Sequence, residues 1–430
     1  MASHFDAVIV GAGPAGASAA ILLARAGWSV ALVEKQRFPR RKVCGECIAA
    51  SNVPLLHALG IGAAFAATAG PELRQVALLR GERRVVADLP AASPAYRWGR
   101  ALGRETLDTL LLEQARSAGA QVLQPWSVQS VRGSAGDWQV ALREVESGQT
   151  RTLSAAVVID AHGSWQALPS ARPLHKARAR SDLFAFKANF RGASLPTGLL
   201  PVLCFNGGYG GMVVADGDVT TLACCIRRDR LDAGRSASSG LRAGEVVEAL
   251  LKRECLGVRD ALHGAIRDGS WLASGPLDPG IRLRPDDEIF RIGNAAGEAH
   301  PIIGEGMSMA LQSAWLLCAH LLRARGANTS TDPTRQREIA RVYAAEWHQQ
   351  FAPRLRLAAA FAHAAMRPVT AAPLMALARI YPGLLTLGAR WGGKTRLAVD
   401  PALLAMNGTV GSLSLGERVG VRDFAYEPNS

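Results

Sequence analysis

The glycine-rich stretch GAGPAG, residues 11–16, restricts the fold of this chain more than any other segment. The apolar run FDAVIV before it predicts a buried strand, residues 15–26 predict a helix, and SVALVEK predicts a second strand. A strand, a helix and a strand in this order form a crossover unit, and such units join parallel strands. The start of the chain therefore predicts an α/β domain with a parallel sheet.

Three glycines in this stretch, Gly11, Gly13 and Gly16, follow the spacing G-x-G-x-x-G. The first glycine of this pattern allows a tight turn, the second lets the backbone approach a pyrophosphate, and the third lets the helix pack on the strand. Glu34 ends the second predicted strand, where a carboxylate can accept hydrogen bonds from ribose hydroxyls. The pattern favours a dinucleotide site over a purely structural turn, and it fits both FAD and NAD.

Two later segments favour FAD. The segment AVVIDAHGS ends a predicted strand with Asp160 and Gly163, and the run at 292–314 supplies Gly293, Gly304 and Gly306. Together with the first turn, these segments give three places where the backbone approaches a ligand closely. A ligand that touches all three must be long, and FAD has that length.

With these motifs, the sequence resembles the FAD-dependent family that includes aromatic hydroxylases of the p-hydroxybenzoate hydroxylase type, geranylgeranyl reductases and flavin halogenases. The resemblance covers roughly the first 325 residues in the family's order. The matching segments are GAGPAG with Glu34, RRKVCGE at 40–46, GRETLDTLLLEQARSAGA with Arg104, DAHG at 160–163 and GNAAGEAHPIIGEGMSMALQSA at 293–314.

The resemblance implies a set of residues that contact FAD. The first turn and Glu34 would hold the ADP half, Arg104 would lie near the pyrophosphate, and Val128 would offer backbone near the adenine. Backbone N–H groups around Gly306 would face the flavin pyrimidine, where such donors stabilise negative charge. The expected cofactor-binding residues are Gly11, Gly13, Pro14, Ala15, Gly16, Glu34, Lys35, Cys44, Gly45, Arg104, Val128, Asp160, Gly163, Gly293, Asn294, Gly304, Glu305, Gly306 and Met307.

Asn294 departs from the family pattern, which usually has aspartate at this place. Asparagine keeps one acceptor oxygen and adds two N–H donors. It can therefore still bind a ribityl hydroxyl or a phosphate oxygen without adding negative charge. We expect this change to tune cofactor affinity and not to abolish binding.

The candidate catalytic residues are Cys44, Glu46, His300 and Pro301. The C-x-x-C pair of Cys44 and Cys47 is compatible with thiol–disulfide chemistry. A second G-x-G-x-x-G for the NAD(P)H domain of such enzymes is missing, however, and the resemblance favours an active-site lining role for residues 42–46. His300 is a candidate proton donor or substrate contact in the segment that should face the flavin. No metal-ligand spacing is found.

The chain length of 430 residues exceeds what one hydrophobic core usually supports, so several domains are expected. We predict a Rossmann-like FAD-binding domain interleaved with a β-sheet substrate domain, followed by C-terminal helices. The predicted FAD-binding domain comprises 1–72, 100–182 and 276–325; the substrate domain comprises 73–99 and 183–275, and the helical region 326–430.

The chain has a net charge of +13, which suits an anionic partner such as NADPH, a carrier-bound substrate or anionic lipid. Its arginines are scattered, which argues against nucleic acid. Without a signal-peptide pattern, and with seven unevenly spaced cysteines, a cytoplasmic location is expected. The apolar segment 355–391 contains four arginines and three prolines, which favours packed helices with at most peripheral membrane contact.

Three reactions fit an FAD enzyme of this type, with NAD(P)H as transient electron donor. We favour a monooxygenase that hydroxylates or epoxidises a hydrophobic aromatic or polyketide-like substrate in secondary metabolism. The second possibility is a geranylgeranyl-reductase-like alkene reductase, suggested by KVCGE and by GGYGG at 207–211. Halogenation is disfavoured because the W-x-W-x-I-P signature is not found. A non-catalytic flavin electron carrier is the least favoured reading.

Overall fold

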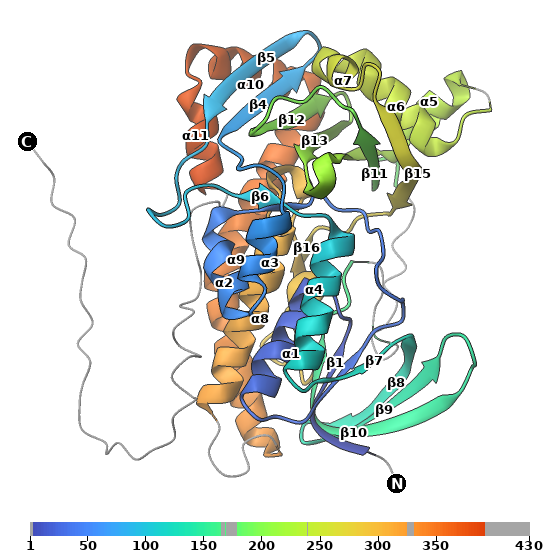
Figure 1. The fold of residues 1–430 in the computed structure, drawn as a ribbon, viewed down its shortest axis with the longest axis vertical. Helices are drawn as coiled ribbons and strands as arrows, with labels where there is room; N and C mark the ends of the chain where they lie inside the picture. The colour runs from blue at the N-terminus through green and yellow to red at the C-terminus, as the bar shows by residue number, and fades with distance from the viewer. Residues whose placement is uncertain (1–2, 165–167, 169–178, 239, 325–330, 392–430) are drawn as a thin grey trace, which may run out of the picture.

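A computed structural model of the chain describes residues 3–164, 168, 179–238, 240–324 and 331–391. The end of the predicted C-terminal region lies outside these residues. Figure 1 shows one sheet in each half of the molecule, with long helices beside both. This arrangement confirms the predicted class: an α/β domain with a Rossmann-like sheet, a second β-sheet unit and C-terminal helices. The exact domain boundaries stay a prediction.

The first sheet has the strand order β7-β2-β1-β10-β9-β8, and β17 pairs with β10. β1 is parallel to both β2 and β10, and α1 (Pro14–Arg25) is the crossover that joins β1 to β2. The predicted crossover unit is therefore present. The strands are β1 (Ser3–Val10), β2 (Val30–Val33), β7 (Gln121–Leu123), β8 (Trp126–Ser134), β9 (Asp137–Glu144), β10 (Thr150–Asp160) and β17 (Phe290–Arg291).

Helices cover one face of this sheet. α4 (Arg104–Ser117) and α8 (Gly306–Arg323) pack beside α1, and α8 is buried on almost every side. The opposite face carries Val8 and Val10, which belong to one apolar cluster with Trp138 of β9. Burial of both faces explains why these strands are continuously apolar. The carboxyl ends of β1 and β10 are thereby held rigidly in place.

The second sheet has the order β15-β11-β14-β13-β12-β4-β5. Its outer face packs against the three helices α5 to α7 through an apolar cluster that contains Phe186, Leu203 and Leu250. The strands are β4 (Gln75–Arg80), β5 (Arg83–Asp88), β11 (Leu183–Arg191), β12 (Leu199–Phe205), β13 (Gly208–Val214), β14 (Thr220–Arg227) and β15 (Ile266–Ser274); the helices are α5 (Arg228–Ala237), α6 (Ala243–Glu254) and α7 (Leu256–Ala261).

Two tight connections shape this sheet. β4 and β5 form a hairpin. A short turn from Asp216 to Asp218 joins β13 to β14, and Gly217 there has φ of 63°, which glycine adopts easily. The remaining short elements are β3 (Cys47–Ile48), α2 (Val53–Ala58), α3 (Gly62–Thr68), β6 (Arg100–Ala101), β16 (Gly280–Ile281) and β18 (Gly297–Glu298).

Three helices follow α8 near the end of the described chain. α9 (Pro333–Met366) begins beside the first sheet and ends beside the second, as Figure 1 shows in orange. α10 (Pro368–Ile380) and α11 (Gly383–Ala389) then pack against β5, where the hydroxyl of Thr386 donates to the Asp88 carbonyl at 2.7 Å. Within the described residues, no single helix is both long and apolar enough to cross a membrane.

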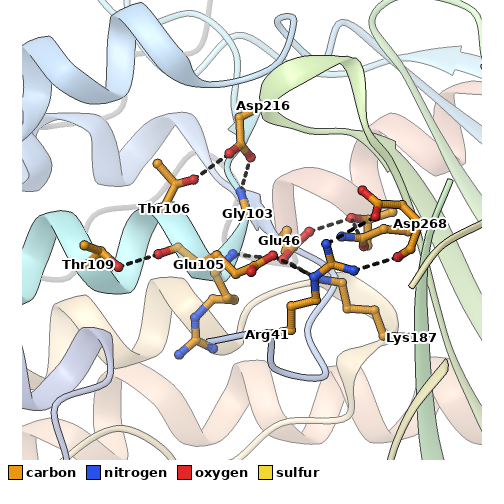
Figure 2. A network of polar contacts seen from close by, with 12 residues as sticks. Arg41, Glu46, Gly103, Glu105, Thr106, Thr109, Lys187, Asp216 and Asp268 are labelled. Carbon is orange, nitrogen blue, oxygen red and sulfur yellow. Dashed lines mark hydrogen bonds and ion pairs between the residues drawn. The ribbon is translucent and has the colours of Figure 1, made fainter. Parts of the chain in front are cut away.

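A polar network joins the two halves at the start of α4 (Figure 2). Asp216 of the second sheet accepts from the Gly103 N–H and from the Thr106 hydroxyl, both at 2.6 Å. Arg41 pairs with Glu105 at 2.9 Å and donates to the Asp268 carbonyl at 2.6 Å. These contacts fix the second sheet above the carboxyl edge of the first.

Candidate functional site

A cavity of about 1030 Å³ lies between the two sheets and reaches α10 and α11. Segments from all three predicted glycine turns line it, although they are far apart in the sequence. The predicted site residues that line the cavity are Gly11, Gly13, Pro14, Ala15, Glu34, Lys35, Cys44, Gly45, Glu46, Arg104, Val128, Gly163, Gly293, Asn294, Pro301, Gly304, Gly306 and Met307.

Four predicted residues lie behind the cavity wall instead: Gly16, Asp160, His300 and Glu305. A Cβ atom on Gly16 would overlap the carbonyl oxygen of Gly11, so Gly16 serves the close packing of α1 on β1. Asp160 ends β10 and bonds the backbone N–H and ring of His162, which itself lines the cavity. Asp160 and Glu305 can therefore act on a ligand only through their neighbours.

The first turn leaves its backbone open to the cavity. Gly11 has φ of 102°, and a Cβ there would lie 2.8 Å from the Ala161 carbonyl oxygen. A Cβ on Gly13 would enter cavity space, with the Nη2 of Arg104 nearest at 3.7 Å. The first N–H groups of α1 have no partners inside the helix and face this space with the positive end of the helix dipole. This geometry suits a bound anion.

Glu34 is held rigidly at the end of β2. Its Oε2 accepts from the Ala12 N–H at 3.0 Å and its Oε1 accepts from the Gln36 N–H at 2.9 Å. Each carboxylate oxygen has a second lone pair, and the residue lines the cavity while being 6% exposed. Ribose hydroxyls could donate to those remaining positions.

Three cations gather beside the first turn. Arg104 makes two bonds of 2.7 Å to Asp108, while Arg40 lies 3.7 Å from both Asp108 and Glu34. Burial, and then the charges of Arg104 and Arg40, lower the pKa of Lys42 to about 8. All three cations line the cavity. Within the described residues, the carboxylates that pair with these cations are Asp108 and Glu34. The cluster therefore has a net positive charge and can bind a further anion.

The third glycine turn leads into α8. Gly304 is left-handed, with φ of 63°, and a Cβ on Gly306 would meet no atom within 4 Å. The N-terminus of α8 therefore opens directly onto the cavity. Ten residues before this turn, the amide of Asn294 donates to the Ser164 hydroxyl at 2.7 Å. This bond connects the short turn at Gly293–Ala295 to the loop after β10.

These features fit FAD. Two helix N-termini, a cationic cluster and two glycines whose missing side chains leave cavity space form a continuous cradle. The residues that would hold the ADP half are those of the first turn with Glu34, and the α8 end would meet the flavin. When bound and reduced, FAD supplies hydride chemistry.

Glu46 lies at the centre of a buried ion pair that joins the two halves (Figure 2). Its carboxylate accepts from the ammonium group of Lys187 on β11, from the Arg104 N–H at 2.9 Å and from the Thr221 hydroxyl at 2.5 Å. Glu46 also has φ of 58°. These partners indicate that Glu46 positions the 42–46 loop. Lys187 and Thr221 were not among the site residues predicted from the sequence.

Tyr209 was missed as a site residue, although the motif GGYGG was noted. It lies on β13, it is one of the residues that line the cavity, and its hydroxyl is 3.1 Å from the Nδ1 of His300. Burial raises the pKa of Tyr209 well above its usual range. Burial, and then the nearby His363, lower the pKa of His300 to about 4. At neutral pH both side chains are therefore uncharged, with the tyrosine on the cavity side.

The cavity extends well beyond the three turns. It passes the inner face of the second sheet, where Leu78, Val202 and Gly211 line it, and continues between β5, α10 and α11. The lining of this part is almost entirely apolar. We call it the apolar arm, formed by Val76, Leu78, Leu200, Val202, Phe361, Leu374, Met375, Leu377, Ala378, Leu384 and Leu385.

No disulfide joins Cys44 and Cys47. Cys44 lines the cavity and accepts from the Glu46 N–H at 3.4 Å, whereas Cys47 is buried in β3. Thiol–disulfide chemistry at this pair stays an untested hypothesis. Among the residues that the structure describes, no cluster of three histidine, cysteine or acidic side chains could hold a metal ion.

Comparisons with known proteins agree with this site. Residues 4–200 match the family described as FAD binding domain. The chain is 39% identical over 119 residues to a menaquinone reductase of Mycobacterium tuberculosis, an alignment that covers 27% of this chain and 28% of that protein. It is 27% identical over 334 residues to a tryptophan 2-halogenase of Chondromyces crocatus, which covers 73% of this chain and 60% of that protein.

Both alignments thus span less than two thirds of these relatives. The fold is shared over a greater length with a solved structure, a myxobacterial chondrochloren halogenase. The two structures superpose with a TM-score of 0.69 at 18% identity, covering 94% of this chain and 96% of the halogenase. The family match over residues 4–200 and the shared fold support the FAD-dependent superfamily that the motifs predicted.

Proposed function

We propose that this protein is a flavin-dependent reductase that saturates a carbon–carbon double bond in a long apolar chain, such as a prenyl group. The apolar arm is the observation that carries the proposal. It begins beside the N-terminus of α8, where the flavin ring would lie, and ends between α10 and α11. A compact aromatic substrate would leave most of this space empty, whereas an extended hydrocarbon chain fills it.

The second element of the proposal is the proton donor. Reduction of an alkene needs a hydride at one carbon and a proton at the other, while the π bond breaks. Bound reduced FAD would supply the hydride, with NAD(P)H as the donor that reduces it. Tyr209 is protonated at neutral pH and lines the cavity, so it can supply the proton.

His300 would act behind Tyr209. Its Nδ1, 3.1 Å from the tyrosine hydroxyl, fixes the orientation of that group. A phenolate formed after proton transfer would regain its proton from bulk solvent after the product leaves, with His300 holding the hydroxyl oxygen in place. In this proposal Tyr209 is the catalytic residue and His300 is a positioning residue.

The menaquinone reductase relative supports a reductase, since its alignment to this chain has 39% identity. This alignment covers 119 residues only. We therefore take from this relative the class of reaction, a reduction, and not the identity of its substrate. The basic balance of the chain would also suit an anionic headgroup on the substrate.

A monooxygenase is the second candidate, and the apolar lining of the cavity favours it. The apolar arm offers water few polar partners. Oxygen transfer by a flavin enzyme requires that water be excluded. The halogenase relative suggests a third chemistry, which the missing W-x-W-x-I-P segment disfavours.

The deciding experiment offers the FAD-loaded protein a twenty-carbon prenyl alkene, a phenol and chloride, with NADPH as electron donor. A reductase forms a product with two more hydrogens in the absence of oxygen. A monooxygenase needs oxygen and incorporates label from ¹⁸O₂, and a halogenase forms a chlorinated product. Anaerobic saturation of the alkene supports the proposal; labelled or chlorinated product, or no turnover with bound flavin, contradicts it.

A further inference from the structure

Exposed apolar side chains gather on α10 and α11. Among the described residues, fourteen large hydrophobic side chains are exposed, and eight of them belong to the short segment 369–391. Val369 is 84% exposed and Ile380 is 68% exposed. The eight side chains, which we call the apolar patch, are Val369, Leu374, Leu377, Ile380, Tyr381, Leu384, Leu387 and Trp391. A concentration of this kind marks an interaction surface.

The apolar patch surrounds the outer end of the cavity. Leu374, Leu377 and Leu384 are exposed to solvent and also line the apolar arm. The two helices lie at the edge of the molecule beside β5, at the upper left of Figure 1. Whatever binds the patch therefore lies next to the mouth through which an apolar molecule would enter.

α10 and α11 together are as hydrophobic as a membrane-spanning segment. Taken together, the two helices are apolar enough for a membrane span, but they are bent by 111° at their junction. With 13 and 7 residues, neither helix is long enough to cross a bilayer. A bent, apolar pair of this length suits the membrane interface, where helices lie parallel to the surface.

The charged side chains of the segment that carries the patch all have one sign. From Trp347 to Val399 the sequence contains no aspartate or glutamate. Arg356, Arg367, Arg379 and Arg390 are exposed in this segment. Arginines beside an apolar face attract anionic lipid headgroups. Tyr381 and Trp391, both 61% exposed, are of the residue types that prefer the membrane interface.

We propose that α10 and α11 form a docking surface for an anionic lipid bilayer and that docking places the mouth of the apolar arm at the level of the acyl chains. An apolar substrate could then enter the cavity without passing through water. The docking surface does not depend on which flavin reaction follows. The delivery of substrate from the bilayer does rest on the proposed function, so the two are tested separately.

The first test measures binding of the full chain to vesicles of phosphatidylglycerol and of phosphatidylcholine by flotation. We expect binding to phosphatidylglycerol that weakens with added salt, and weaker binding to phosphatidylcholine. The double variant Val369→Asp, Ile380→Asp should bind at least about tenfold less well. Each change replaces an apolar side chain that would insert into the lipid. Neither residue lines the cavity.

The matched control is Ile266→Asp on β15, which removes a side chain that is 74% exposed outside the patch. Its vesicle binding should equal that of the wild type, and circular dichroism should show that all variants fold. Failure of the wild type to float with phosphatidylglycerol overturns the proposal. So does a concentration-dependent dimer that the double variant abolishes, because the patch would then bind a second copy of the chain.

The second test separates docking from catalysis. The double variant should reduce detergent-dispersed alkene as fast as the wild type but should lose activity toward the same alkene embedded in phosphatidylglycerol vesicles. Equal losses in both assays contradict delivery through the docked surface. Vesicle binding by a protein that reduces neither form of the alkene would leave docking intact and sink the proposed reaction.

Discussion

Burial, and then the charges of Arg104 and Arg40, lower the pKa of Lys42 to about 8. Below that pH the lysine is charged and attracts a pyrophosphate; above it, the charge is lost. We therefore expect the dissociation constant of FAD to increase by about tenfold between pH 7 and pH 9. Fluorescence titration measures it, and Lys42→Met should remove most of the dependence. Equal wild-type affinity at both pH values would contradict this role.

Glu46 and Lys187 form an ion pair in which each side chain is 2% exposed. Removing one partner leaves the other charge buried and unpaired, so Glu46→Ala should lower the free energy of unfolding by about 3–5 kcal/mol. Urea denaturation measures the change. As a control, Glu146→Ala breaks an exposed pair with Arg37 and should leave the free energy of unfolding nearly unchanged. Similar effects of both variants would refute the structural role of Glu46.

Tyr209 offers the test of the proposed proton donor. Replacing it by phenylalanine keeps the ring and removes the hydroxyl that His300 contacts at 3.1 Å. Alkene reduction should slow by about 10²- to 10⁴-fold, while FAD affinity and the rate of flavin reduction by NADPH should stay unchanged. Stopped-flow absorbance follows both half-reactions separately. An unchanged rate of alkene reduction would exclude Tyr209 as the acid.

At the scale of elements, two glycines at the start of α1 have different roles. A methyl group on Gly13 would enter the cavity, whereas one on Gly16 would overlap the Gly11 carbonyl. Gly13→Ala should thus weaken FAD binding, on the order of tenfold, with an unchanged thermal midpoint. Gly16→Ala should instead lower the thermal midpoint of the apoprotein. A result in which Gly13→Ala unfolds the protein and Gly16→Ala only weakens FAD binding would reverse these assignments.

The first turn, Glu34 and the start of α8 could be predicted from sequence because each depends on a short local pattern. The contacts of Glu46 could not, since Lys187 is 141 residues away and meets it only when the two sheets pack together. The position of His300 was predicted too near the ligand. Its segment does face the cavity, but its ring contacts the hydroxyl of Tyr209, which is 91 residues away in the sequence and which no local pattern pairs with it.

At the scale of the whole molecule, α9 joins the two halves and leads the chain to α10 and α11. The apolar segment there predicts packed helices, and the structure confirms them as separate helices. That these helices line the same cavity as the glycine turns is not visible in the sequence. That continuity depends on the placement of β5 and α10 relative to the FAD-binding half, which no local pattern encodes.

The continuous cavity makes chain length the most direct test of the account. Reduced FAD-loaded protein is mixed anaerobically with prenyl alkenes of five, ten, fifteen and twenty carbons, and flavin reoxidation is followed by absorbance. If the apolar arm holds the substrate, kcat/KM should increase with each added unit because each buries more apolar surface. The rise should be smaller in Met375→Trp, which would narrow the arm. A rate that is the same for all lengths, or no reoxidation by any alkene, would contradict the central claim.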